Sequence, residues 1–280
     1  MGTAGLKEKK QSLLGLNKRK KQKEKLEVRN EERILGGKTP FYVREAYKTL
    51  RTNLMFSLPV DQSRVILVTS AGVGEGKTTS SLNTAISFAA TGAKVCLVDC
   101  DLRRPNVARL CGEKGSPGLT NVLIKMNTLD EVIRKSKFPN LDIVFSGDIS
   151  PNPSELLASN GMKEVLKTLS ERYEYVFIDT PPVNVVTDAS VLAASASGVL
   201  LVANQQKASK NDVAKAINQL NFVKAKILGI LLNNAEIEDE KGRKYRYSRY
   251  RYSRYYGRYY GRYYGKYYNY YSPYGEDNND

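Results

Sequence analysis

The feature that most restricts the fold is a glycine-rich turn between an apolar run and a helical segment. Residues 71–79 read Ala-Gly-Val-Gly-Glu-Gly-Lys-Thr-Thr, which fits the pattern GxxxxGK[ST] except that Ala71 replaces the first glycine. The apolar run 64–69 precedes this turn, and a helix over 77–90 and a second apolar run over 95–98 follow it. A strand, a loop, a helix and a strand in this order predict a βαβ unit with a parallel sheet.

The same alternation continues along the chain. Four further strands are predicted at 141–145, 175–178, 198–202 and 227–232, and four further helices at 42–58, 154–171, 187–195 and 209–223. The chain has 280 residues, 41% of them hydrophobic, which is enough for one sizeable core. We therefore predict one α/β domain over residues 35–238, a doubly wound parallel sheet with a P-loop NTPase fold.

The basic charge of the chain belongs to its two ends. Residues 1–30 carry ten Lys or Arg against three acids, and residues 241–280 also carry ten against three. Each end therefore holds +7 of the total of +15, which leaves about +1 for the rest. Residues 1–34 are predicted to be a flexible basic arm that contacts anionic lipid or only aids solubility.

The C-terminal segment, residues 239–280, is predicted to be disordered. Of the 19 tyrosines of the chain, 15 lie between residues 245 and 274, interleaved with Arg, Ser and Gly. Aromatic rings at this density without aliphatic neighbours cannot offset the loss of chain entropy by ordinary packing.

Composition excludes several classes of function. Histidine is absent, which removes Ser-His-Asp and Cys-His catalysis and the commonest zinc ligand. The three cysteines, Cys96, Cys100 and Cys111, lack metal-site spacing and indicate a reducing compartment. Cys96 and Cys100 are expected to be small buried residues and not redox switches. No signal peptide or membrane-spanning run is recognised, so we expect a soluble, cytoplasmic protein.

The glycine-rich turn predicts a phosphate site. Its backbone N–H groups would wrap a β-phosphate, Lys77 would reach the β- and γ-phosphates, and the Thr78 hydroxyl would face Mg²⁺ at a helix N-terminus. The predicted nucleotide-binding residues are Ala71, Gly72, Val73, Gly74, Glu75, Gly76, Lys77, Thr78 and Thr79.

Acidic residues follow two of the predicted strands. Asp99 and Asp101 end the second strand, and Asp179 ends the strand that reads Phe-Ile-Asp-Thr-Pro-Pro. The carboxyl ends of parallel strands line the crevice where such sheets bind ligands. One such aspartate alone could cap a helix, but three beside a phosphate loop indicate a metal and phosphoryl site.

Together these motifs resemble the bacterial tyrosine kinases of capsule and exopolysaccharide synthesis, in the form whose cytoplasmic kinase is a separate chain. The resemblance covers residues 40–274 and rests on the phosphate loop, the Asp-x-Asp-Leu-Arg-Arg-Pro segment 99–105, the Asp-Thr-Pro-Pro segment and the tyrosine cluster. It implies ATP and Mg²⁺ as cofactors, and catalytic roles for Lys77, Asp99, Asp101 and Asp179. By the same resemblance, Thr78, Asp101 and Asp179 would hold the metal, and Asp99 would accept the proton of a tyrosine hydroxyl.

The resemblance also implies assembly and partners. Glu45, Lys48 and Arg51 match the Glu-x-x-Arg-x-x-Arg self-association motif of the family, with lysine for the first arginine. This implies a ring of identical chains in the unphosphorylated state. A transmembrane chain-length determinant would activate the kinase at the inner face of the plasma membrane, and a tyrosine phosphatase would oppose it. Asn233 would either contact adenine, as the corresponding family segment does, or only end its strand.

The tyrosine cluster is then the expected site of autophosphorylation. The expected positions are Tyr255, Tyr256, Tyr259, Tyr260, Tyr263, Tyr264, Tyr267, Tyr268, Tyr270 and Tyr271. The partitioning and septum-site ATPases share the fold but carry a lysine five residues before the phosphate-binding lysine, where this chain has Gly72. An ATPase whose Arg-Tyr-Gly tail binds nucleic acid, and a non-kinase ATPase with an adhesive tail, are the remaining alternatives. No specific nucleic acid is expected.

Overall fold

The computed structural model describes residues 33–59, 64–238 and 244–246. Contacts within the chain divide it into two compact units, the first ending at Asn233 and the second beginning at Asn234. In the described ranges, no helix combines the length and apolar composition required to cross a membrane.

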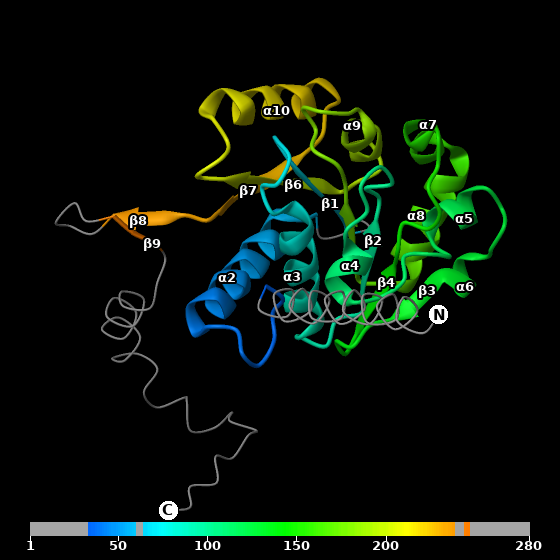
Figure 1. Ribbon diagram of the computed structural model, residues 1–280, viewed down its shortest axis with the longest axis horizontal. Helices are drawn as coiled ribbons and strands as arrows, with labels where there is room; N and C mark the ends of the chain where they lie inside the picture. The colour runs from blue at the N-terminus through cyan, green and yellow to red at the C-terminus, as the bar shows by residue number, and fades with distance from the viewer. Residues whose placement is uncertain (1–32, 60–63, 239–243, 247–280) are drawn as a thin grey trace, which may run out of the picture. The chain divides into compact units, whose positions relative to one another are not determined.

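Seven strands of the described part of the chain form one sheet in the order β3-β4-β2-β5-β1-β6-β7 (Figure 1). They are β1 (Val65–Ser70), β2 (Val95–Asp99), β3 (Ile133–Lys135), β4 (Leu141–Val144), β5 (Tyr175–Asp179), β6 (Gly198–Asn204) and β7 (Ile227–Asn233). All neighbours pair in parallel except β3, which runs antiparallel to β4. The predicted parallel sheet is confirmed, and the three-residue edge strand β3 is an addition.

The helices that the structure describes in the first unit flank this sheet (Figure 1). They are α2 (Phe41–Ser57), α3 (Lys77–Ala89), α4 (Val107–Cys111), α5 (Leu119–Leu123), α6 (Leu129–Val132), α7 (Pro153–Ala158), α8 (Asn160–Arg172), α9 (Asp188–Ala193) and α10 (Lys210–Phe222). The helix predicted over 154–171 is in fact two helices. Ser159 has extended backbone angles, and its hydroxyl caps α8 by accepting the Met162 N–H at 3.2 Å.

The sheet is covered on both faces, as a doubly wound fold requires. Alternate residues of β1 enter different cores: Val65 and Leu67 pack with α8, α9 and α10, whereas Ile66 and Val68 pack with α2, α3 and α4. Burial on both faces explains why the strands read as continuous apolar runs.

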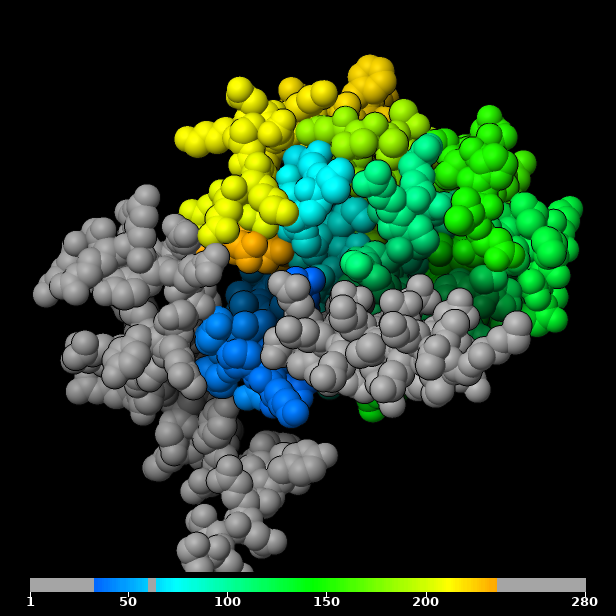
Figure 2. Space-filling model, viewed as in Figure 1, coloured from blue at the N-terminus to red at the C-terminus, as the bar shows by residue number. Residues whose placement is uncertain are grey.

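The segment before the first strand packs on α3. Ile34, Leu35, Leu54 and Leu58 are buried in the same core as the apolar face of α3. The backbone N–H of Leu35 also donates to the Asn83 side-chain carbonyl at 2.8 Å. On the surface, α2 (blue) adjoins β7 (orange), as Figure 2 shows. Residues 33–58 are therefore part of the domain.

The second unit contains a short antiparallel pair of strands, β8 (Glu236–Glu238) and β9 (Lys244–Arg246). In the backbone register, Glu236 lies opposite Arg246 and Glu238 opposite Lys244. The expected disordered tail begins at residue 239, so β9 is a strand inside a segment for which none was predicted. The remainder of that tail, and the arm before residue 33, lie outside the described residues.

Candidate active site

The phosphate loop joins β1 to α3 and needs glycine at two positions. Gly74 and Gly76 have φ values of +75° and +93°, in the left-handed region that favours glycine. A Cβ on Gly76 would lie 2.1 Å from the Asn233 amide nitrogen. Ala71, which replaces the first glycine of the pattern, is buried and 1% exposed, so the loop accommodates its methyl group. The side chain of Val73 is 64% exposed.

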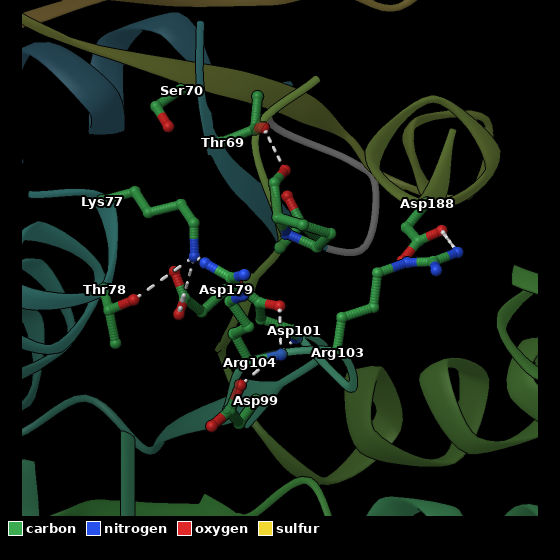
Figure 3. A network of polar contacts seen from close by, with 12 residues as sticks. Thr69, Ser70, Lys77, Thr78, Asp99, Asp101, Arg103, Arg104, Asp179 and Asp188 are labelled. Carbon is green, nitrogen blue, oxygen red and sulfur yellow. Dashed lines mark hydrogen bonds and ion pairs between the residues drawn. The ribbon is translucent and has the colours of Figure 1, made fainter. Parts of the chain in front are cut away.

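Lys77, the first residue of α3, is held among carboxylates. Its Nζ donates to Asp101 Oδ2 at 2.7 Å and lies 3.9 Å from Asp179 Oδ2 (Figure 3). It also lies 3.4 Å from Thr78 Oγ1. Burial by itself would lower the pKa of Lys77, but the charges of Asp179 and Asp101 raise it above its ordinary value. Lys77 is therefore a fixed ammonium in the crevice.

The sheet register brings the acidic strand ends together. Asp99 of β2 lies opposite Asp179 of β5 in the parallel pairing. Asp179 Oδ1 accepts the Ser81 hydroxyl at 2.9 Å, whereas Asp179 Oδ2 is buried and accepts no hydrogen bond from the described residues. Burial raises the pKa of Asp179. A buried carboxylate oxygen without a hydrogen-bond donor requires an explanation, and a bound cation is one that suits a carboxylate.

Asp99 and Asp101 have different surroundings. Asp99 is fully buried, and its two oxygens accept the backbone N–H groups of Asp101 at 3.2 Å and Val107 at 3.1 Å. Burial, followed by the charge of Asp179, raises the pKa of Asp99. Asp101 instead bonds Lys77, and its other oxygen accepts the Arg104 N–H at 3.0 Å. The spacing in sequence makes the two aspartates equivalent, but the structure does not.

Glu75 folds back into the phosphate loop, which the sequence did not indicate. Its Oε1 accepts the backbone N–H of Gly72 at 2.9 Å, and its Oε2 is buried without a hydrogen-bond partner among the described residues. The side chain is almost inaccessible, since Glu75 is 3% exposed. Burial raises the pKa of Glu75 above its ordinary value.

A polar network links the aspartate loop to the segment after Asp179. Arg103 donates to both oxygens of the buried Asp188, at 2.9 and 3.1 Å, and to the Ser154 hydroxyl at 2.8 Å (Figure 3). Ser154 in turn donates to Asp188 at 2.6 Å. Asp188 begins α9, so this network fixes the position of α9 relative to the loop that follows β2. Sequence patterns gave no signal for it, because its members are 34 and 85 residues apart.

The expected self-association residues lie on α2 but differ in exposure. Glu45 and Lys48 form an exposed ion pair at 2.7 Å. Arg51 instead points to α3 and donates to the Ser87 carbonyl at 2.6 Å. Arg51 therefore joins two helices of one chain in this structure. The ten expected phosphorylation sites lie outside the described residues.

Comparison with known proteins gives the family. The sequence profile of an AAA domain matches residues 63–234, which include the phosphate loop and the three aspartates Asp99, Asp101 and Asp179. Tyrosine-protein kinase YwqD of Bacillus subtilis is 40% identical over 193 residues, covering 69% of this chain and 81% of that protein. The chain belongs to the bacterial tyrosine kinases. Its enzymatic class is accordingly that of an ATP-dependent protein-tyrosine kinase, as the motifs predicted.

Two further comparisons agree with this family. Tyrosine-protein kinase CpsD of Streptococcus pneumoniae is 37% identical over 198 residues, covering 70% of this chain and 86% of that protein. The solved kinase domain of the Escherichia coli tyrosine kinase ETK is 32% identical with a TM-score of 0.66. That match covers 68% of this bacterial tyrosine kinase and 74% of the solved chain.

Proposed function

We propose that this kinase transfers the γ-phosphoryl group of Mg²⁺-bound ATP to tyrosines of its own C-terminal cluster, in a neighbouring copy. The observation that carries the proposal is the position of Lys77 between Asp101 and Asp179, at the start of a helix whose loop can wrap phosphates. Phosphoryl transfer mainly requires the protein to position the reactants and to neutralise charge on the phosphates, and these residues supply both.

The residues present fit Mg²⁺ and a nucleotide. Asp179 offers a buried oxygen without a donor, and Asp101 and Thr78 lie within reach of the same ammonium, Lys77. Carboxylate and hydroxyl oxygens are the ligands that Mg²⁺ prefers, and it is usually bound through one or two carboxylates together with substrate phosphates. When bound, the ion would neutralise charge on the transferred phosphoryl group. Thr78, Asp101 and Asp179 would hold it.

Asp99 is the proposed acceptor of the tyrosine proton. Its raised pKa is that of a stronger base than an exposed aspartate, and its burial beside Asp179 is the cause. Asp99→Asn and Asp101→Asn separate the two roles. We expect Asp101→Asn to weaken Mg²⁺-dependent ATP binding, and Asp99→Asn to lower the rate of transfer with little effect on that binding. An equal fall in ATP affinity for both variants would remove the assignment of Asp99 as the base.

The charge of the tail suggests how phosphorylation acts. Residues 241–280 carry +7, and each phosphotyrosine adds about −1.5 to −2, so five or six modifications reverse the sign. An unmodified tail is attracted to the acidic site of a neighbouring copy, and a modified tail is repelled from it. We infer a cycle in which rings of unphosphorylated chains disperse as the tails are modified. Light scattering of graded phosphorylated states tests this, and a mass that does not change with phosphate content would contradict it.

The partners of the kinase follow from its family. We propose that a transmembrane chain-length determinant recruits and activates it at the inner face of the plasma membrane, and that a tyrosine phosphatase resets the tail. The pathway it regulates would be the polymerisation and export of capsular or exocellular polysaccharide. The names of relatives support the enzyme class, and the assignment of partners rests on the family resemblance.

Mass spectrometry after incubation with ATP and Mg²⁺ tests the main proposal. We expect phosphate on tyrosines of 245–274 in the unaltered protein, and none in Lys77→Met. Lys167→Met is a matched control, because the side chain of Lys167 on α8 is 78% exposed. The assay is run with and without the cytoplasmic segment of a candidate activator. If the protein hydrolyses ATP but the tyrosines of 245–274 stay unmodified both with and without the activator segment, the proposal that these tyrosines are the substrate is refuted.

The nucleic-acid alternative is not favoured, since the relatives are tyrosine kinases. That alternative predicts that immobilised DNA or RNA retains the tail in a salt-dependent manner, and the same protein preparation can be used to test this.

A further inference from the structure

Two side chains near the ends of the neighbouring strands β6 and β7 contact the phosphate loop. Lys207, which follows β6, donates from Nζ to the carbonyl of Gly74 at 3.0 Å. Asn233, the last residue of β7, donates from Nδ2 to the carbonyl of Glu75 at 3.0 Å. Strands β6 and β7 are paired up to this point, since Asn204 lies opposite Asn233. Lys207 and Asn233 are together called the loop clasp.

The loop clasp fixes the direction of two backbone amides. In a planar trans peptide unit the C=O and the N–H of the next residue point in opposite directions. A hydrogen bond that holds the Gly74 carbonyl toward Lys207 therefore turns the Glu75 N–H away from Lys207. In the same way, the bond between the Asn233 amide and the Glu75 carbonyl turns the Gly76 N–H away from Asn233. These are amides of the turn expected to wrap phosphate.

The glycines on either side leave the loop free to adopt other conformations unless something holds it. Gly74 and Gly76 both have positive φ, and glycine populates many backbone conformations at little energetic cost. The clasp side chains lie so close that a Cβ at either glycine would displace them. A Cβ on Gly74 would lie 2.9 Å from Lys207 Nζ, and one on Gly76 would lie 2.1 Å from Asn233 Nδ2. Glycine at residues 74 and 76 therefore allows both the turn and the contact with the loop clasp.

The charge of Lys207 is also available to the loop. Lys77 is bonded to Asp101 and Arg103 to Asp188, whereas the Lys207 ammonium contacts a neutral carbonyl. A cation on a peptide carbonyl polarises that peptide unit and adds positive potential where an anion binds.

We propose that Lys207 and Asn233 are positioning residues that preset the amides of residues 75 and 76 for the phosphates of a nucleotide. This inference rests on the proposed function, because it assigns the loop to nucleotide binding. It does not require that the tail is the substrate. Since the β-phosphate is common to ADP and ATP, the clasp should strengthen the binding of both.

Titration of the full chain with fluorescent ADP and with a non-hydrolysable ATP analogue, both with Mg²⁺, tests the proposal. Loss of one preset hydrogen bond should weaken each nucleotide by about fivefold to tenfold in Lys207→Ala and in Asn233→Ala. Lys207→Arg keeps a donor and should restore most of the affinity. Asn233→Asp has nearly the same shape but cannot donate, so it should bind no better than Asn233→Ala. Lys210→Ala, an exposed lysine at the start of α10, is the matched control.

Hydrogen exchange gives a readout that does not depend on activity. A peptide covering residues 71–77 should exchange faster in the clasp variants than in the unaltered chain, with unchanged exchange in β1 and α8. Unfolding temperatures measured without nucleotide identify any variant that has lost its fold. If an alanine variant does not fold, Lys207→Arg and Asn233→Asp are the conservative variants that take its place in the comparison.

Each other outcome overturns the proposal. Nucleotide affinities that do not change in the clasp variants would show that the loop needs no clasp. A loss confined to the ATP analogue would mean that Lys207 contacts the γ-phosphate and not the loop. Failure of the unaltered chain to bind either nucleotide would refute the proposed function itself, and with it the clasp.

Discussion

Replacing Glu75 by glutamine should stabilise this kinase. Glu75 is a buried acid inside the phosphate loop, and one of its oxygens accepts the Gly72 N–H while the other has no partner among the described residues. Glutamine keeps the shape and the first acceptor, and removes the buried charge. Burial disfavours this charge and raises the pKa of Glu75, although the hydrogen bond from the Gly72 N–H lowers that pKa in part.

The magnitude follows from the buried charge, because the side-chain amide of glutamine would leave the second polar atom equally without a partner. A buried group without a partner destabilises a fold by about 1–3 kcal/mol, and by more when it is charged. We expect Glu75→Gln to recover about 1 kcal/mol near pH 7.5, which corresponds to a rise in Tm of about 2–4 °C for a domain of this size.

The gain should depend on pH with a definite sign. Because the folded-state pKa is above the ordinary value of 4.5, the folded protein binds more protons between the two pKa values than the unfolded chain. The stability of the unaltered protein therefore falls in this window as pH rises, whereas the amide of the variant does not titrate. The difference in Tm between the variant and the unaltered protein should be small near pH 4. It should reach its maximum once the pH exceeds the folded-state pKa of Glu75.

Differential scanning calorimetry without nucleotide is the appropriate assay, since the chain has no tryptophan for fluorescence. Glu113→Gln, at an exposed position just after α4, controls for the change of net charge. A lower Tm for Glu75→Gln, or the same gain at pH 4 and pH 7.5, would refute the reasoning.

Two further predictions concern the contacts around the site. Arg103→Ala leaves the buried Asp188 without its cation, and should lower the free energy of unfolding by about 1–3 kcal/mol, less than for a fully buried pair because Arg103 is 39% exposed. Adding Asp188→Asn should recover most of this loss in urea denaturation, and no recovery would argue against the ion pair as the cause. Arg51→Ala removes the bond to the Ser87 carbonyl and should destabilise by about 1 kcal/mol, against less than about 0.5 kcal/mol for the exposed Lys48→Ala. Equal effects at the two positions would show that Arg51 does not hold α2 on α3.

The elements that the sequence predicted well are those with a strong local signal. The phosphate loop has a fixed spacing, and the strands on either side of it are continuous apolar runs, so β1, α3 and β2 lie within a residue or two of the predicted bounds. The acidic strand ends were predicted to meet because parallel strands end at one edge, and the pairing of Asp99 with Asp179 confirms this.

Other features leave no pattern in the sequence. Helices α4, α5 and α6 have five, five and four residues, which is too short for a helical period to be recognised. The contacts of Lys207 and Arg103 depend on side chains brought together by the fold, since Lys207 lies 133 residues from its partner Gly74. Tertiary packing decides such contacts, and local propensity carries no information about them.

Residues 33–58 cover α3, and this limits how far the chain can be shortened from its N-terminal side. The matched family region begins at residue 63, yet Leu35, Leu54 and Leu58 fill the core beside α3, which carries Lys77 at its first turn. A protein shortened to 63–234 would expose this apolar face to water and leave Asn83 without the N–H of Leu35. We therefore expect a fragment that folds on its own to start before Ile34, about 30 residues upstream of the start of the matched family region.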